Sequence, residues 1–165
     1  MHAETLYEEQ LFSRGITAIL SAITLGLLLA VVYQILVGPL GEHPAPNWFL
    51  LYLFLLFLAV TITFSRLSII ITSRAVTVGY GIFRRTISWD NIERCSVDEA
   101  STIRYGGWGI RIGHVQGKWR LVYNVIGGPR VVLTLKRGMF REFVFSTSNP
   151  EAVMAVIRQR IGRMV

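Results

Sequence analysis

The sequence predicts an α+β membrane protein in which an N-terminal hairpin of two transmembrane helices precedes an antiparallel β-barrel or sandwich capped by a C-terminal helix. Three patterns predict this class. Two long uncharged apolar runs occupy the first 65 residues, the next 80 alternate between apolar and polar side chains, and the last repeat apolar side chains at helical spacing. A hydrophobic fraction of 52% and a mean hydropathy of +0.49 are high for one soluble domain of 165 residues.

The first apolar run covers residues 15–37 and contains no charged side chain. At about 1.5 Å per residue, it is long enough to cross a hydrocarbon core of about 30 Å. A second uncharged run covers residues 48–64. Neither run has the amphipathic stripe of a helix on a soluble core, and the acidic leading segment differs from that of a cleavable signal peptide. We therefore expect two membrane spans.

The loop between the two runs, residues 38–47, is rich in glycine and proline, which end helices, so the two spans should form a hairpin. This loop contains no Lys or Arg. Basic residues instead precede the first run or follow the second: Arg14, Arg66, Arg74, Arg84 and Arg85. The positive-inside rule then predicts a multi-pass protein of the cell (plasma) membrane with both termini in the cytoplasm.

Charge divides the chain at the end of the second run. Residues 1–65, the expected tail and hairpin, carry one Arg and four Glu, a formal charge of −3. Residues 66–165, the expected β domain, carry sixteen Lys or Arg and six Asp or Glu, a formal charge of +10. A basic domain tethered to a bilayer suits anionic lipid headgroups or an acidic protein partner. No nucleic-acid motif accompanies the charge, so nucleic acid is not an expected partner.

In the β domain, apolar side chains recur at every second residue, which is typical of strands. Residues 67–72 and 76–82 should form a hairpin across the turn at 73–75. Further strands are expected at 85–89, 92–97, 109–112, 119–123, 130–136 and 140–146, with turn residues between them. The final helix, about 149–163, should begin with Asn149 as its N-cap.

This order, a run of strands followed by one amphipathic helix, resembles that of the membrane-anchored pleckstrin-homology-like proteins of bacteria and archaea. The resemblance covers residues 66–162. The similar segments are 67–72, Val78-Gly79-Tyr80-Gly81, Ile87-Ser88-Trp89-Asp90-Asn91-Ile92, Tyr105-Gly106-Gly107-Trp108-Gly109-Ile110-Arg111 and Ser146-Thr147-Ser148-Asn149-Pro150-Glu151. The resemblance implies a fold rather than an activity, since one fold hosts many roles.

The candidate binding residues fall into two groups. The first group consists of arginines that either follow lipid phosphates together or form a solvated face that only sets topology: Arg66, Arg74, Arg84 and Arg85. The second is the glycine-rich segment around Trp108, with Arg104 and Arg111. This segment either receives a phosphate headgroup on its backbone N–H groups or forms a bulged corner with Trp108 packed inside.

Signals for catalysis are weak. The single cysteine, Cys95, excludes an intramolecular disulfide and a multi-cysteine zinc site. His114 is the only histidine of the β domain, and no motif joins it to a nucleophile or carboxylate. Gly79 and Gly81 precede Arg84, which stands where a dinucleotide fingerprint needs a third glycine; a turn with positive φ explains both glycines instead. We expect no catalytic residue, metal or cofactor.

These patterns favour a non-enzymatic, membrane-anchored binding or scaffold module at the cytoplasmic face. Its expected partners are membrane lipids and either another protein or a second copy of the chain. An alternative is an accessory subunit of a larger membrane complex, which only polar Gln34 and the glycine-bearing first span support. An enzyme of unknown class is the third hypothesis.

Overall fold

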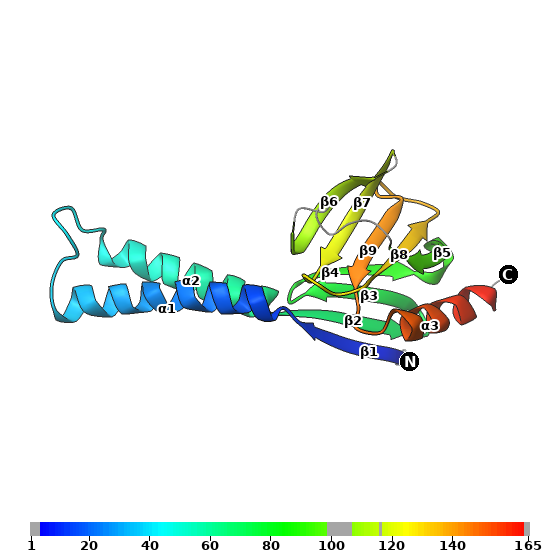
Figure 1. Ribbon diagram of the computed structural model, residues 1–165, viewed down its shortest axis with the longest axis horizontal. Helices are drawn as coiled ribbons and strands as arrows, with labels where there is room; N and C mark the ends of the chain where they lie inside the picture. The colour runs from blue at the N-terminus through cyan, green and yellow to red at the C-terminus, as the bar shows by residue number, and fades with distance from the viewer. Residues whose placement is uncertain (1–3, 99–106, 116, 164–165) are drawn as a thin grey trace. The chain divides into compact units, whose positions relative to one another are not determined.

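The computed structural model describes residues 4–98, 107–115 and 117–163 (Figure 1). The chain forms two compact units. One is a helical hairpin made of Ser13–Ser65. The other contains two β-sheets and a helix, and it combines the strand at Thr5–Phe12 with the part of the chain that begins at Arg66. We call the second unit the sheet domain.

The hairpin consists of helix α1 (Arg14–Leu36) and helix α2 (Asn47–Phe64), which contact each other along their lengths (Figure 1). Their ends lie within one residue of the two predicted runs. Both helices are long and apolar enough to cross a membrane. No residue of α2 is buried and only Leu20, Thr24 and Val31 are buried in α1, so neither helix is enclosed like the core helix of a soluble domain.

Several polar side chains in the hairpin find partners within it. The Thr24 hydroxyl lies 3.2 Å from that of Thr61 on the facing helix, and each also donates to a carbonyl of its own helix. Gln34 Nε2 donates to the Ala45 carbonyl and to Asn47 Oδ1, each at 2.6 Å. These bonds tie the end of α1 to the start of α2, since amides in an apolar setting need partners.

The first sheet is antiparallel and contains four strands in the order β1-β2-β3-β4. Their bounds are β1 (Thr5–Phe12), β2 (Arg66–Thr72), β3 (Ala75–Tyr80) and β4 (Phe83–Ser88). The predicted hairpin across residues 73–75 is confirmed by the β2–β3 pairing. The 3-10 helix η1 (Trp89–Asn91) then carries the chain to the second sheet.

The second sheet has five strands in the order β5-β8-β9-β7-β6. Their bounds are β5 (Ile92–Val97), β6 (Gly109–Val115), β7 (Lys118–Asn124), β8 (Arg130–Leu135) and β9 (Glu142–Ser146). The predicted strands are therefore present, with small shifts at their ends. The expectation of a purely antiparallel domain is wrong, because the β8–β9 hairpin lies between β5 and β7 and leaves β9 parallel to β7.

The two sheets form a sandwich, and the described residues contain no closed barrel (Figure 1). The barrel alternative fails because β4 and β5, although successive, are separated by η1 and pair in different sheets. The core between the layers takes alternate residues of the strands, including fully buried Leu67, Ile69 and Tyr80 from the first sheet and Phe143 and Phe145 from the second. Burying each such side chain contributes about 1.5–3 kcal/mol.

The C-terminal helix α3 (Pro150–Gly162) confirms the predicted helix and contacts β5, β1 and β8. Its N-cap is Asn149, whose side chain accepts a hydrogen bond from the Ala152 amide at 3.1 Å. Val153 and Ile157 are fully buried, and their one-turn spacing places them on the same face of the helix. Apolar periodicity and the cap together therefore fix both the position and the orientation of α3.

Strand β1 was not predicted, because its residues were assigned to the tail before the first span. It pairs with β2 along seven residue partners, and its carboxylate Glu9 fastens it to the connection between β9 and α3. Glu9 accepts hydrogen bonds from Thr147 Oγ1 at 2.6 Å, from the Ser148 amide at 2.7 Å and from Tyr7 at 3.0 Å. Burial opposes ionisation of Glu9, but these hydrogen bonds outweigh it and lower its pKa.

Because the pKa of Glu9 is lower in the folded protein, its contribution is present above the ordinary glutamate pKa of 4.5 and is lost as the pH falls below that value. We expect amide exchange of β1 in the detergent-solubilised chain to accelerate in this acidic range. At neutral pH, Glu9→Gln should raise β1 exchange roughly fivefold, or about 1 kcal/mol, because the site is partly exposed. Glu8→Gln, the exposed neighbour, is the control; equal effects of the two variants would contradict this role.

Candidate functional site

Strand register brings three of the predicted arginines to one end of the first sheet. A single row of partners crosses its four strands through Leu11, Leu67, Tyr80 and Phe83. Phe12 and Arg66 form the next pair after Leu11 and Leu67, and they lie on the same side of this row as the β3–β4 turn. Arg84 and Arg85 follow on β4. Arg66, Arg84 and Arg85 therefore belong to the same end of the first sheet, although alternation places Arg85 on the opposite face from Arg66 and Arg84.

The β3–β4 turn is shaped by two glycines for different reasons. Gly81 has a φ of +48°, which confirms the expected left-handed turn residue, and its carbonyl accepts from Arg84 Nε at 2.9 Å. The expectation of a positive φ is wrong for Gly79. A glycine is needed there because the backbone of the paired strand β4 approaches it closely. A Cβ on Gly79 would lie 2.5 Å from the Arg84 Cα on the paired strand.

Arg85 lies on the face of β4 that points toward the core, since its partner Val78 is fully buried. Its guanidinium lies near Tyr123, whose ring stacks on Tyr80 at 6.3 Å between centroids. Burial raises the pKa of Tyr123, and the positive charge of Arg85 partly offsets this rise. The exposed Arg85 thus acts electrostatically on one member of a buried tyrosine pair that joins the two sheets.

Arg74 does not join this group. It occupies the β2–β3 turn, where its amide donates to Thr72 Oγ1 at 3.3 Å. The length of β2, about 3.3 Å for each of its seven residues, separates this turn from Arg66. The sequence placed Arg74 near the membrane exit because it is only eight residues from Arg66, but an extended strand carries those residues to the far end of the sheet.

The glycine-rich segment is described only from Gly107, so Arg104 lies outside the described residues. Arg111 Nε donates to the Trp108 carbonyl at 3.3 Å, and the buried Asn124 side chain donates to the Gly107 carbonyl. Trp108 is half-buried. The described part of the segment is thus held by hydrogen bonds to its carbonyls, which favours the structural corner over the phosphate loop.

Sequence reasoning missed a buried ionic network on the outer face of the second sheet. Asp98 pairs with Arg130 at 2.8 Å and with Arg120 at 3.3 Å, and Arg120 also pairs with Glu142. All four side chains are at most 10% exposed. Lys118 extends the network toward solvent, 3.5 Å from Glu142.

A weak signal for this network exists in the sequence. On each of three neighbouring strands, a charged residue stands two positions before a valine of the buried cluster Val122, Val132 and Val144. Alternation places each charged residue on the same face as its valine. The strand order β8-β9-β7, which makes these three pairs neighbours, is what the sequence does not reveal.

The described residues hold no group of three or more His, Cys, Asp or Glu side chains that could bind a metal ion. His114 contacts the ring of Trp119, at 5.1 Å between centroids. Cys95 is buried, and burial raises the pKa of its thiol to about 12, which leaves it unreactive near neutral pH.

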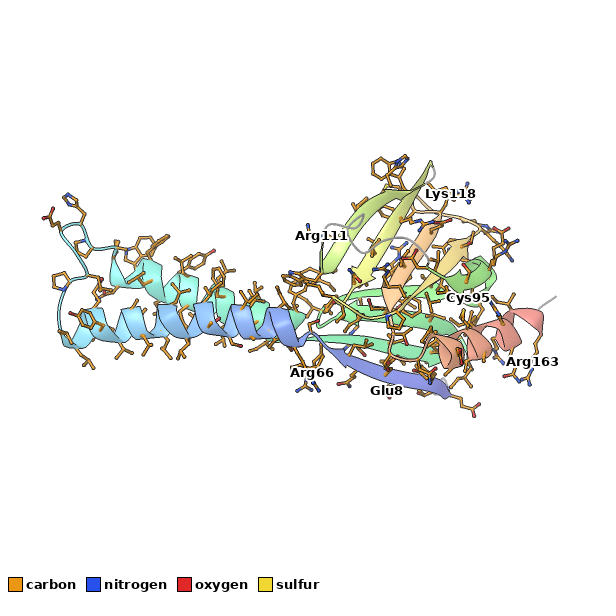
Figure 2. The ribbon with its side chains drawn as sticks, viewed as in Figure 1. Glu8, Arg66, Cys95, Arg111, Lys118 and Arg163 are labelled. Carbon is orange, nitrogen blue, oxygen red and sulfur yellow. The ribbon has the colours of Figure 1, made fainter. Side chains whose placement is uncertain are left out.

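Basic side chains occur at both ends of the sheet domain. Figure 2 shows Arg66 at one end and Arg163 at the other, with Lys118 distant from both. Arg160 reaches the Ser73 carbonyl at 2.9 Å, and so lies with Arg74 at the end away from Arg66. Positive charge by itself therefore does not identify a single binding surface.

No protein-family model, curated protein or solved structure matches this chain.

Gly79→Ala should destabilise the β3–β4 turn, because the added methyl group collides with the backbone of the paired strand. We expect a loss of about 1–3 kcal/mol, the usual range for overpacking, seen as a lower apparent melting temperature of the detergent-solubilised chain. Gly162→Ala is the matched control, since a Cβ there meets nothing within 4 Å. An unchanged melting temperature for Gly79→Ala would contradict this prediction, because it would mean that β3 and β4 can move apart without loss of stability.

Asp98→Asn should destabilise the sheet domain strongly. The amide keeps the shape of Asp98 but leaves the two buried guanidiniums without their shared anion, and breaking a buried ion pair typically costs about 3–5 kcal/mol. Thermal or denaturant unfolding followed by tryptophan fluorescence measures the loss. Glu93→Gln, an exposed carboxylate on β5, should change stability little. Similar losses in both variants would mean that the network does not stabilise the fold.

Proposed function

We propose that the chain is a non-enzymatic binding module anchored in the plasma membrane by α1 and α2, whose basic sheet domain binds anionic lipid headgroups or a protein partner at the cytoplasmic face. The observation that carries the proposal is the direct joining of helices to strands. Only Ser13 separates β1 from α1, and only Ser65 separates α2 from β2.

The β1–β2 pairing supports a topology in which both ends of the hairpin emerge on the same side of the membrane. Because β1 precedes α1 and β2 follows α2, the two strands can pair only if the chain crosses an even number of times. The absence of Lys and Arg from the 38–47 loop, against +10 in residues 66–165, supports the cytoplasmic side for the domain and both termini.

A pleckstrin-homology-like fold for residues 66–162 is part of the proposal. The order of strands followed by one capping helix supports it, and the helix covers one side of a two-sheet sandwich. Two features depart from a simple run of antiparallel strands: the added N-terminal strand β1 and the parallel β7–β9 pair. The proposed role is binding because residues 66–165 carry a formal charge of +10, which suits anionic lipid headgroups or an acidic protein partner.

The lipid-binding half of the proposal is tested by native mass spectrometry of the full-length chain in mild detergent. Each cation near an anionic surface contributes about 1 kcal/mol, so two contacts should favour phosphatidylglycerol over phosphatidylcholine by roughly 30-fold. Added salt should reduce this preference, because screening weakens exposed charge interactions. Equal retention of the two lipids at low salt would remove anionic lipid as a ligand.

The accessory-subunit alternative has one structural observation in its favour. A shallow cavity of about 280 Å³ lies between α1 and α2, lined by apolar residues and by the hydroxyl residues Ser21, Thr24 and Thr61. Small and hydroxyl-bearing residues are common where membrane helices pack together. In the same spectra, a complex heavier than the 18.6 kDa chain and its lipids would favour this alternative.

A further inference from the structure

The end of the first sheet that carries Arg66, Arg84 and Arg85 also exposes large apolar side chains. Ile82, at the β3–β4 turn, is 84% exposed, and Phe83 and Phe12 are each 50% exposed. We call these six residues, Phe12, Arg66, Ile82, Phe83, Arg84 and Arg85, the tip surface. Several large apolar side chains exposed at one end of a sheet are typical of a membrane or protein contact, whereas a single exposed one would not be.

Each apolar residue of the tip surface adjoins a cation, either by contact or along the chain. The Arg66 guanidinium lies over the Phe12 ring, 5.2 Å from its centroid, and Arg84 and Arg85 directly follow Phe83. The nearest carboxylates on β1 are those of Glu8, on the same face of the strand as Phe12, and Glu9, which is bound to Thr147 and Ser148. Apolar side chains flanked by arginines match a bilayer interface, where acyl chains lie beneath anionic phosphates.

Chain connectivity keeps two residues of the tip surface, Phe12 and Arg66, near the helix residues to which they are joined. A single residue joins Phe12 to α1, and a single residue joins Arg66 to α2, so each joint spans about 7 Å at most. Strand spacing places Ile82 within about 10 Å of Arg66. If α1 and α2 span the membrane, the tip surface lies within reach of the headgroup layer.

We propose that the tip surface is an interfacial anchor: Ile82 and Phe83 enter the boundary between headgroups and acyl chains, and Arg66, Arg84 and Arg85 contact lipid phosphates. This inference rests on the proposed membrane anchoring and names the residues that meet the anionic bilayer. The β3–β4 turn thereby gives the sheet domain a third attachment besides its two helix joints. A third attachment restricts rotation of the domain about those joints.

Site-directed spin labelling of the full-length chain in lipid nanodiscs containing phosphatidylglycerol tests the anchor. Ile82→Cys carries the label, and Met139→Cys is the control, since Met139 is 79% exposed and lies in the β8–β9 turn. Thr86→Cys, four residues further along β4, gives an intermediate position. The native Cys95 is buried and its thiol is unreactive near neutral pH, so it need not be replaced.

We expect the ratio of collision with oxygen to collision with a water-soluble nickel chelate to be several-fold higher at position 82 than at position 139, with position 86 between them. Nickel access at position 82 equal to that at 139 would overturn the anchor. Shielding of position 82 from both reagents would also overturn it, because that pattern indicates contact with protein, such as a second copy of the chain.

Charge variants separate this inference from the proposed function. Arg84→Gln with Arg85→Gln should lower the preference for phosphatidylglycerol several-fold in native mass spectra, whereas Lys136→Gln with Arg137→Gln, exposed cations near the β8–β9 turn, should leave it nearly unchanged. Equal losses from both pairs would refute the tip surface but retain lipid binding by the domain. No preference in the unmodified chain would instead refute lipid binding itself.

Discussion

The pairing of β1 with β2 is the constraint on which the rest of the structure depends. These strands are neighbours in one sheet, and each is separated from an apolar helix by a single serine. Because each joint is a single residue, Phe12 lies within about 7 Å of the first residue of α1, and Arg66 lies within about 7 Å of the last residue of α2. The position of every other strand relative to the helix joints then follows from register. This is why the β3–β4 turn, rather than the β2–β3 turn, belongs to the same end as Phe12 and Arg66.

The sheet domain contains two different kinds of buried surface, one between its two sheets and one on the outer face of the second sheet. Between the sheets, the core is apolar and includes the stacked Tyr80 and Tyr123, whose contact is reinforced by a 2.7 Å bond from the Tyr80 hydroxyl to the Asn124 carbonyl. On the outer face of the second sheet, valines lie beside an ionic network. We infer that this network disfavours other strand orders, because an incorrect order would leave buried charges without partners.

The ionic network also bears on the charge available for binding. Arg120 and Arg130 are neutralised by Asp98 and Glu142, two cations by two anions, so the +10 of residues 66–165 belongs to the remaining side chains. This charge is present at both ends of the domain (Figure 2). Attraction to an anionic surface alone would therefore not orient the domain. At the tip surface the cations stand beside the exposed side chains of Ile82 and Phe83, whereas Arg74 stands beside the polar Thr72 and Ser73.

The sequence by itself determined the two apolar helices, most strands, the C-terminal helix and the uneven charge, because these depend on periodicity, capping and composition within short windows. Apart from the predicted β2–β3 hairpin, only the tertiary structure decided which strands are neighbours. In the structure, Thr5–Phe12 forms a strand of the first sheet, and Arg74 lies at the other end of that sheet from Arg66. One buried ionic network contains Asp98, Arg120, Arg130 and Glu142. Each of these outcomes joins residues far apart in the chain, and strand order and register, which bring such residues together, are set by the packing of the whole domain rather than by any local pattern.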